Sequence, residues 1–323
     1  MEYITWDRGG HMKQNIDADY TMERAAKFGI SKMMVHVKKM DYPLGEYCRA
    51  ANKAGLEVHP WVKPAFAVKN FVKRTLSPER RKAQIEQYGF ELARACLNNQ
   101  STMEEGISNI KIVIDRFGEH IKGIHLDYVR NDNALFLKDY PCECDMCKSI
   151  RKKWLGHEVL TRDDLNNPAV MYKEISIRNR NITKFVREVK KIVKNADLKL
   201  SMAARANYIN QYDVEKAPVY GLGPAVYEGQ DWLAWAEEGL FDFIATMNYF
   251  TDPDAFENVL EDHLRLLEDT PADFYTGLGI ESSMGALAPE EANILIEKVK
   301  NTSAKGISLF HFEAITDKYH FSK

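Results

Sequence analysis

The nine residues Lys122-Gly-Ile-His-Leu-Asp-Tyr-Val-Arg130 decide the fold, because they have the pattern of a buried strand that ends in polar side chains. Successive side chains of a strand point to opposite faces, so His125 and Asp127 share one face. Polar side chains on an inward face are costly unless they have partners or a task. Asp127 is therefore a candidate functional residue, and the alternative is a hydrogen-bonded cap at the end of the strand.

Eight stretches of the chain have strand-like patterns, and amphipathic helical patterns separate most of them. Alternation of strands and helices predicts a parallel sheet with right-handed crossovers. Eight such units predict an α/β protein with a single (β/α)8 TIM barrel domain over residues 1–323. A doubly wound sheet with an appended helical piece is the alternative, which the lack of a GxGxxG or GxxxxGK[ST] motif after an early strand disfavours. The expected strands are Tyr3–Asp7, Met33–Val37, Leu56–Trp61, Gly123–Tyr128, Leu198–Ala203, Phe241–Met247, Phe274–Leu278 and Gly306–Phe310.

The expected helices have recognisable ends. Two of them, Asp19–Phe28 and Leu44–Ala54, stop at a glycine that can form a left-handed cap. Ser101–Glu104 predicts a capping box for a helix that runs to Phe117, and Ser77-Pro78 predicts another helix start. Only Phe312–Lys323 follows the eighth strand, so we expect the last helix to be short or missing. The remaining expected helices are Ile175–Lys194, Asp231–Glu238, Asp254–Leu267 and Pro289–Val299.

The spacing between strands predicts enlarged loops after the third and fourth strands, around Pro64–Gln100 and Asn131–Val170. Loops that follow strands lie on the C-terminal face of a barrel, where barrel enzymes keep their active sites. We therefore expect these loops to form walls beside Asp127.

Composition excludes several classes of protein. A net charge of -3 and a pI near 6.3 give no sign of nucleic-acid binding. No run of about 18 apolar residues is present, so no membrane span is expected. The N-terminus goes straight into a strand-like pattern without a leader, which favours a cytoplasmic protein, or a secreted one whose leader was removed. No feature of the sequence specifies an oligomeric state.

The ends of the expected strands combine carboxylates with aromatic residues. Aromatic rings stack on the apolar face of a sugar, while carboxylates and amides bind its hydroxyls. Glycoside hydrolysis needs one carboxylic acid as proton donor and a second carboxylate as nucleophile or base. We therefore predict a glycoside hydrolase for oligo- or polysaccharides, with Asp127 and Glu281 facing each other across the barrel mouth as the catalytic pair. The predicted substrate-binding residues are Asp7, His36, His59, Trp61, His125, Tyr128, Arg205, Asn248, Tyr249 and Glu313. For Asp7 and Glu313, a hydrogen-bonded strand cap is the stronger alternative.

Gly123–Arg130 resembles the fourth-strand motif of the glycosyl-hydrolase-like family 10 proteins, a group of glycoside-hydrolase-type barrels. Gly55–Trp61 is similar to the third strand of that family, Leu198–Ala203 to its fifth strand, and Gln230–Tyr249 to its fifth helix and sixth strand. The resemblance covers most of the expected barrel in the right order. It implies the fold and the glycoside hydrolase superfamily, and it does not specify the sugar.

Asp127 also resembles the nucleophile position of the α-amylase-like barrels, although His125 stands where those barrels usually have Arg. No Glu ends the fifth strand, where those barrels keep their acid, and Arg205 lies nearby instead. The candidates for the acid are therefore, in order, Glu281, Asp252 and Glu313.

A cysteine triplet, Cys142-Glu-Cys-Asp-Met-Cys147, follows the fourth strand. This spacing puts the thiolates of Cys142, Cys144 and Cys147 within reach of one zinc ion, which takes four tetrahedral ligands. The fourth ligand is either Cys96 or His157. One upstream cysteine plus this triplet resembles the structural zinc site of family 42 β-galactosidases. The alternative is a set of reduced loop thiols.

Two other functions compete with hydrolysis. A phosphate-binding metabolic barrel enzyme would use glycines such as Gly277–Gly279 and Gly285, but they are not clustered as a phosphate loop requires, and Lys63 is the lysine nearest to a strand end. A non-catalytic carbohydrate-binding barrel would keep the aromatic residues and need only one of the carboxylates. Those aromatic residues are Trp61, Tyr128 and Tyr249.

Overall fold

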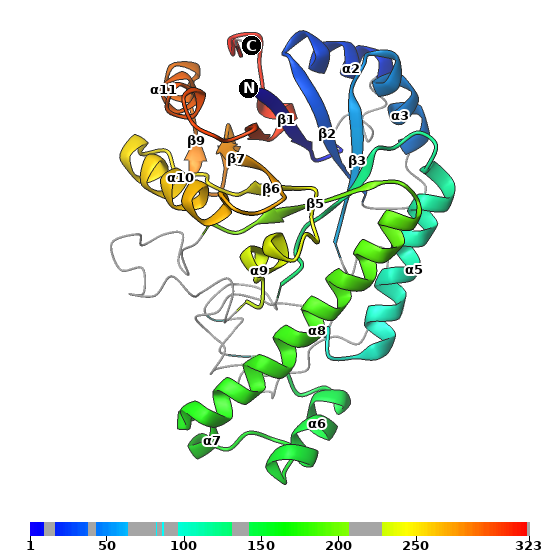
Figure 1. The fold of residues 1–323 in the computed structure, drawn as a ribbon, viewed down its shortest axis with the longest axis vertical. Coiled ribbons are helices and arrows are strands. Elements are labelled where there is room, and N and C mark those ends of the chain that lie inside the picture. The colour runs from blue at the N-terminus through cyan, green and yellow to red at the C-terminus, as the bar shows by residue number, and fades with distance from the viewer. Residues whose placement is uncertain are drawn as a thin grey trace.

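The computed structural model describes residues 1–9, 17–37, 43–63, 82, 86, 96–130, 142–206 and 228–321. Eight parallel strands close into a barrel in the order β1-β10-β7-β6-β5-β4-β3-β2 (Figure 1), which confirms the predicted TIM barrel. The strands are β1 (Glu2–Asp7), β2 (Ile30–His36), β3 (Glu57–Val62), β4 (Gly123–Leu126), β5 (Lys199–Ala204), β6 (Phe243–Thr246), β7 (Asp273–Gly279) and β10 (Gly306–Phe310). Each corresponds to one of the eight expected strands.

The strands are apolar on both faces because the barrel is packed inside and covered by helices outside. Inside, Ile4, Trp6, Met34, Phe243 and Tyr275 belong to one buried cluster. Outside, a second and larger cluster fills the space between strands and helices. A filled interior leaves the ends of the strands, rather than a central pore, as the place for a site.

The helices around the barrel correspond to the expected ones, although the helix expected from Ile175 begins at Pro168. They are α2 (Ala18–Lys27), α3 (Leu44–Lys53), α5 (Gln100–Phe117), α8 (Pro168–Asn195), α9 (Trp232–Glu237), α10 (Pro253–Leu267) and α11 (Pro289–Lys300). From β10 to residue 321 the described chain forms only the 3-10 turn η4 (Phe312–Ala314), as expected. None of the helices that are described is long and apolar enough to cross a lipid bilayer.

The start of α5 differs from the expected capping box. Asn99 is the N-cap, and its side chain accepts a hydrogen bond from the backbone N–H of Ser101. An Asn side chain reaches the backbone N–H two residues ahead, so the helix begins earlier than a Ser101 cap would allow. The other expected start, at Ser77-Pro78, lies outside the described residues.

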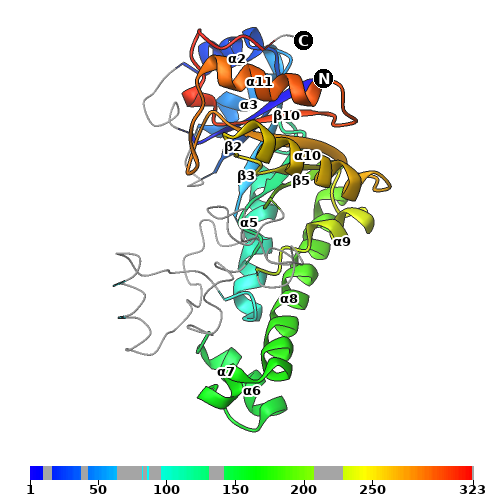
Figure 2. The same ribbon diagram turned by 90° about the vertical axis from the view of Figure 1, so that its left-hand side faces the viewer.

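A small lobe of helices lies beyond one end of the barrel (Figures 1 and 2). α8 has 28 residues and is about 42 Å long, whereas the six residues of β5 span about 20 Å. The helix runs antiparallel to the strands, so its first half extends past their C-terminal ends, where α6 (Asp145–Leu155) and α7 (Arg162–Asn166) accompany it (Figures 1 and 2). Most of the expected enlarged loop after the third strand, and residues 131–141 after the fourth, lie outside the described residues.

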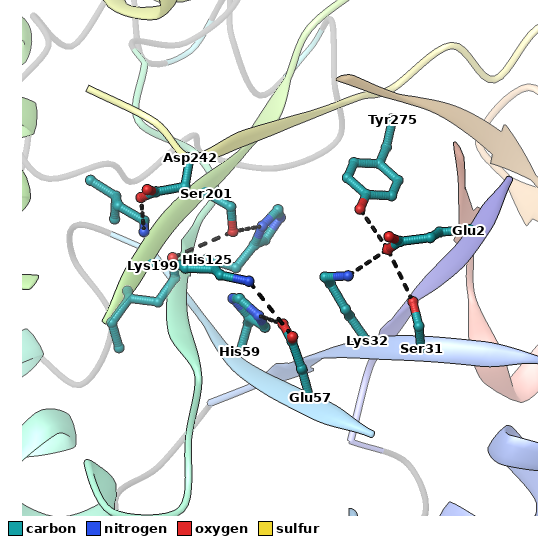
Figure 3. A network of polar contacts seen from close by, with 12 residues as sticks. Glu2, Ser31, Lys32, Glu57, His59, His125, Lys199, Ser201, Asp242 and Tyr275 are labelled. Carbon is teal, nitrogen blue, oxygen red and sulfur yellow. Dashed lines mark hydrogen bonds and ion pairs between the residues drawn. The ribbon is translucent and has the colours of Figure 1, made fainter. Parts of the chain in front are cut away.

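Charged side chains line the opposite, N-terminal end of the barrel (Figure 3). Lys32 Nζ lies 2.5 Å from Glu2 Oε2, which also accepts a hydrogen bond of 2.8 Å from the Tyr275 hydroxyl. Lys199 Nζ lies 3.6 Å from Glu57 Oε1. These contacts link neighbouring strands across the base of the barrel.

Candidate active site

Asp127 lies immediately after β4 and is 4 % exposed. Its Oδ2 accepts a hydrogen bond of 3.1 Å from Trp61 Nε1. Its Oδ1 accepts from the backbone N–H of Tyr128 at 2.6 Å and from Arg130 Nη1 at 3.3 Å. Three N–H donors from different groups thus converge on one carboxylate, and an ionised carboxylate is a pure acceptor. This arrangement suits a nucleophile or a base rather than a proton donor.

Tyr128 has a left-handed backbone, with a φ of 56°. This conformation is rare for a bulky residue and costs on the order of 1–3 kcal/mol. It accompanies the short hydrogen bond that Tyr128 N–H donates to Asp127. Strain of this kind persists where the surrounding structure holds the chain in place, and here it lies directly beside the candidate carboxylate.

Two cations lie on the aromatic rings next to Asp127. Lys63 Nζ is 4.2 Å from the ring centre of Tyr128 and 5.9 Å from that of Trp61, and Arg130 Cζ is 4.3 Å from the Tyr128 ring. The His36 ring is 4.4 Å from Trp61, which is only 7 % exposed. Trp61, one of the predicted aromatic sugar contacts, therefore offers little open ring surface, and its N–H donates to Asp127.

Glu228, which the sequence analysis did not single out, is buried beside this group at 2 % exposure. Its Oε2 lies 3.2 Å from Arg205 Nε and 3.7 Å from Arg130 Nε. The backbone N–H of Arg205 donates to Gln230 Oε1 at 2.7 Å, which ties the end of β5 to the start of α9. No motif marks Glu228, and the only signal is its place in a polar stretch before the Asp231 cap.

Tyr249 follows β6 and lies close to the same carboxylate. Its ring stacks on Phe310 at 5.1 Å and meets Trp6 edge-on at 6.2 Å. Burial, together with the negative charge of Asp127, raises the pKa of Tyr249 well above its usual value. Tyr249 is therefore a neutral phenol beside the candidate carboxylate.

The predicted sugar contacts at His125 and His59 are wrong, because both side chains are fully buried inside the barrel (Figure 3). His125 Nε2 accepts a hydrogen bond of 3.0 Å from the Trp6 indole, so its Nδ1 carries the hydrogen that faces Ser201 Oγ at 2.9 Å. Burial lowers the pKa of His125 well below its usual value, which makes it neutral. His59 contacts Glu57 toward the base of the barrel.

The predicted sugar contacts at Asp7 and Asn248 are also wrong. Both side chains are fully buried. Asp7 Oδ1 accepts from the backbone N–H of Gly9 at 2.8 Å, as the capping alternative predicts. Asn248 donates to the Phe256 carbonyl at 3.2 Å and to Thr276 Oγ1 at 3.4 Å. Strand alternation turns these two residues away from the mouth and toward the surrounding layer.

Glu313 belongs to a second polar group, at the end of β10, which lies opposite β4 in the closed barrel. Glu313 Oε2 lies 2.8 Å from His311 Nδ1 and accepts from the backbone N–H of Arg8 at 3.3 Å. Arg8 Nη1 lies 3.1 Å from His311 Nε2. Asp252 caps α10 by accepting from the backbone N–H of Ala255 at 2.8 Å, which gives it a structural task.

Glu281 follows β7, in a two-residue strand, β8 (Glu281–Ser282), that pairs with β9 (Gly285–Ala286). Ser282 packs against Gly279, where an added Cβ would come within 2.8 Å of Ser282 Oγ. Glu281 is exposed, and the alternation of the strand directs it to the other side. Its side chain is therefore open to solvent, and no ion pair or hydrogen bond of it is found among the described residues.

The cysteine triplet forms a buried cluster with Cys96. The Sγ atoms of Cys96, Cys142, Cys144 and Cys147 all lie within 4.8 Å of one another. Cys96 Sγ and Cys147 Sγ are 3.5 Å apart, close to the edge of about 3.8 Å that Zn–S bonds of about 2.3 Å give a tetrahedron. His157, the other candidate ligand, instead bonds to Asp164 at 2.7 Å. The four thiols therefore fit a tetrahedral metal ion.

Comparison with known proteins supports the fold. No family model matches the chain, and none of the curated proteins matches it either. Solved structures that resemble it include the glycoside hydrolase domain of PgaB (BpsB) from Bordetella bronchiseptica, with 11 % identity, a TM-score of 0.67, and coverage of 100 % of this chain and 99 % of that one. The catalytic domain of a β-amylase from Paenibacillus polymyxa has 9 % identity and a TM-score of 0.62 over 98 % of this chain and 94 % of that one. An endo-1,4-β-D-mannanase from Thermotoga petrophila has 13 % identity and a TM-score of 0.58 over 96 % and 88 %. At these identities the likeness is one of fold, and the fold is a (β/α)8 barrel of the kind found in these glycoside hydrolases.

Proposed function

We propose that the protein is a glycoside hydrolase that acts on an oligo- or polysaccharide. The observation that carries this proposal is Asp127, a carboxylate held by three N–H donors at the C-terminal mouth of a (β/α)8 barrel. The glycoside hydrolases among the structures of similar fold support it. A non-catalytic carbohydrate-binding barrel would need only one carboxylate, so the second candidate function is separated from the first by the test of hydrolysis below.

Hydrolysis breaks the bond between the anomeric carbon and the leaving oxygen, which takes a proton, and the anomeric carbon receives the hydroxyl of water. We assign Asp127 as the nucleophile or base. We assign the proton donor to Glu281, the first candidate from the sequence, which follows β7 and has no cationic partner among the described residues. Glu313 is the second candidate, because it follows the strand opposite β4.

The remaining predicted substrate contacts stay in the proposal because they are partly exposed around the mouth. They offer aromatic surface, a cation, an imidazole and a carboxylate, which are the groups that bind sugar rings and hydroxyls. They are His36, Tyr128, Arg205, Tyr249 and Glu313.

A screen of aryl glycosides and polysaccharides tests the function. We expect the wild-type protein to release reducing sugar from at least one of them, and the Asp127→Asn variant to release far less. Oligosaccharide binding without hydrolysis in any assay would support the binding barrel instead.

Trp61→Phe tests the hydrogen bond to Asp127. A hydrogen bond to a charged group contributes about 1.5–3 kcal/mol, so kcat/KM should fall about tenfold to a hundredfold. The matched control is Trp235→Phe, which removes an indole N–H bonded to Thr183 Oγ1 at 3.1 Å in the helical layer. Equal activity of Trp61→Phe and wild type would show that this donor is not needed.

We also propose that the four clustered cysteines bind a structural zinc ion, and that residues 1–323 form one domain. Bound zinc would link the start of α5, through Cys96, to the start of α6, through Cys144 and Cys147. Arg151 is buried in the same helical lobe. It pairs with Glu174 at 2.5 Å and donates a hydrogen bond to the Cys142 carbonyl at 2.6 Å, and both contacts stabilise the lobe.

Elemental analysis of protein purified without added metal should find about one zinc per chain. Cys147→Ser should lower this content strongly, because it removes one of four ligands. Cys48→Ser, which changes a buried cysteine of α3 outside the cluster, should keep it. Less than about a tenth of one zinc per chain, with all cysteines open to a thiol reagent, would contradict the proposal.

A further inference from the structure

The guanidinium of Arg130 bridges two buried carboxylates. Its Nη1 lies 3.3 Å from Asp127 Oδ1, and its Nε lies 3.7 Å from Glu228 Oε2. Because one planar group spans both contacts, the two carboxylates are less than about 10 Å apart. Arg205 also contacts Glu228, with its Nε 3.2 Å from Oε2 and its Nη2 3.3 Å from Oε1.

We propose that Glu228 is a positioning residue that acts on Asp127 through Arg130. Glu228 takes part of the hydrogen-bonding capacity and positive field of Arg130, which would otherwise fall on Asp127 alone. The contacts of Glu228 with Arg205 hold the Glu228 carboxylate in place. This carboxylate in turn fixes the position of the Arg130 guanidinium, which donates a hydrogen bond to Asp127. The catalytic meaning of this inference rests on the proposed function, but the electrostatic coupling does not.

The groups around Asp127 set the expected direction of the effect. Cations favour the ionised form of a neighbouring carboxyl group, and a second carboxylate disfavours it. His125, on the same strand, is buried and neutral, so it adds no charge. Among the described residues, the charged or titratable groups on the neighbouring segments include Lys63, Arg130, Arg205, Glu228, Tyr128 and Tyr249. Loss of the Glu228 charge should therefore favour the ionised form of Asp127.

Titration of the Asp127 carboxyl carbon by 13C NMR tests the coupling without any need for activity, with the signal assigned by Asp127→Asn. We expect Glu228→Gln to move the midpoint to lower pH, because the ionised form loses a repelling neighbour. Arg205→Gln should move it up, because it removes a cation and leaves Glu228 to compete more strongly for Arg130. The two variants give opposite signs, so either one tests the idea if the other does not fold.

The matched control is Glu238→Gln. Glu238 also forms an ion pair with an arginine, with its Oε1 2.7 Å from Arg187 Nε, but on the outer surface. This control changes the net charge equally and should leave the Asp127 midpoint where it is. An unchanged midpoint in Glu228→Gln, or shifts of the same sign in Glu228→Gln and Arg205→Gln, would overturn the inference.

The kinetic readout uses an aryl glycoside that the wild-type protein hydrolyses. The acidic limb of the pH profile of kcat/KM should move to lower pH in Glu228→Gln and return in Glu228→Asp, which keeps the charge. A merely structural role would lower activity at every pH without moving the limb. Failure of the proposed function would appear separately, as full activity of Asp127→Asn.

Discussion

Replacing Asp127 by Asn is expected to lower turnover at least about a hundredfold, the lower range for loss of a group that acts directly in the reaction. Asparagine has the shape of the carboxylate, but its amide cannot attack an anomeric carbon or accept a proton. Its NH2 group would also face one of the three N–H donors that now point at Asp127. This mismatch should cost about 1–3 kcal/mol of stability, which a folded domain can tolerate. Steady-state kinetics, with circular dichroism to check the fold, measures both effects.

The identity of the leaving group separates the roles of the carboxylates. A variant without the proton donor should recover rate on a substrate with an activated leaving group, because such a group departs without a proton. We expect this recovery for Glu281→Gln and none for Asp127→Asn. If Glu281→Gln keeps full activity on natural glycans while Glu313→Gln shows the recovery, Glu313 is the donor. If neither variant loses activity, neither residue is the acid.

Acid should destabilise this protein strongly, because His263 is buried without any hydrogen-bond partner for either ring nitrogen among the described residues. Its neighbours are the rings of Trp232 and Phe274. Burial lowers the pKa of His263 to about 3, against about 6.5 in an unfolded chain. The unfolded chain therefore binds the extra proton between these pH values. The stability is fully present above about pH 6.5 and decreases as the pH falls toward 3, by on the order of 5 kcal/mol for this residue.

His59 and His125 should also make the folded protein less stable as the pH falls, because burial lowers the pKa of both. Glu57 also makes the folded protein less stable in acid, at lower pH than the histidines. Its pKa is lowered to about 2, mainly by its hydrogen bond with His59. Stability from Glu57 is present above its unfolded value and is lost as the pH falls below it.

His263→Leu tests the contribution of that residue, because leucine has a similar volume and no polar atoms. Urea unfolding should show a gain of about 1–3 kcal/mol near neutral pH, the cost of a buried unsatisfied polar group, and a flatter pH dependence below 6.5. His320→Leu changes an exposed histidine and should do neither. An unaltered pH dependence in His263→Leu would contradict the assignment.

The barrel could be predicted from sequence because each strand has a local apolar pattern, bounded by helices with capping signals. The site could be predicted only in part. Asp127 stands out because its strand is so clearly buried, but alternation alone does not say which face of a strand points inward. Asp7 and Asn248 were misplaced for that reason, since both point to the outer layer.

Long-range contacts explain what the sequence analysis missed. Glu228 meets Arg130 from a segment about a hundred positions away, and no local pattern marks that meeting. His125 looks like a functional residue, yet its ring nitrogens are used by Trp6 and Ser201, which come from other strands. The cysteine cluster is easier to predict from the sequence. Three of its four members are close in sequence, and clustered thiols at this spacing are typical of metal sites.

The pairing of β1 with β10 has a consequence for how the protein folds during synthesis. Thr5 Oγ1 donates to the Leu309 carbonyl, a contact between residues 304 positions apart. The edge of β1 that β10 covers stays open until residues 306–310 have left the ribosome, and open strand edges pair readily with other chains. Contacts between such distant residues also make folding slow. The nascent protein should therefore depend on chaperones until β10 arrives, and aggregation should rise when translation stops before residue 306.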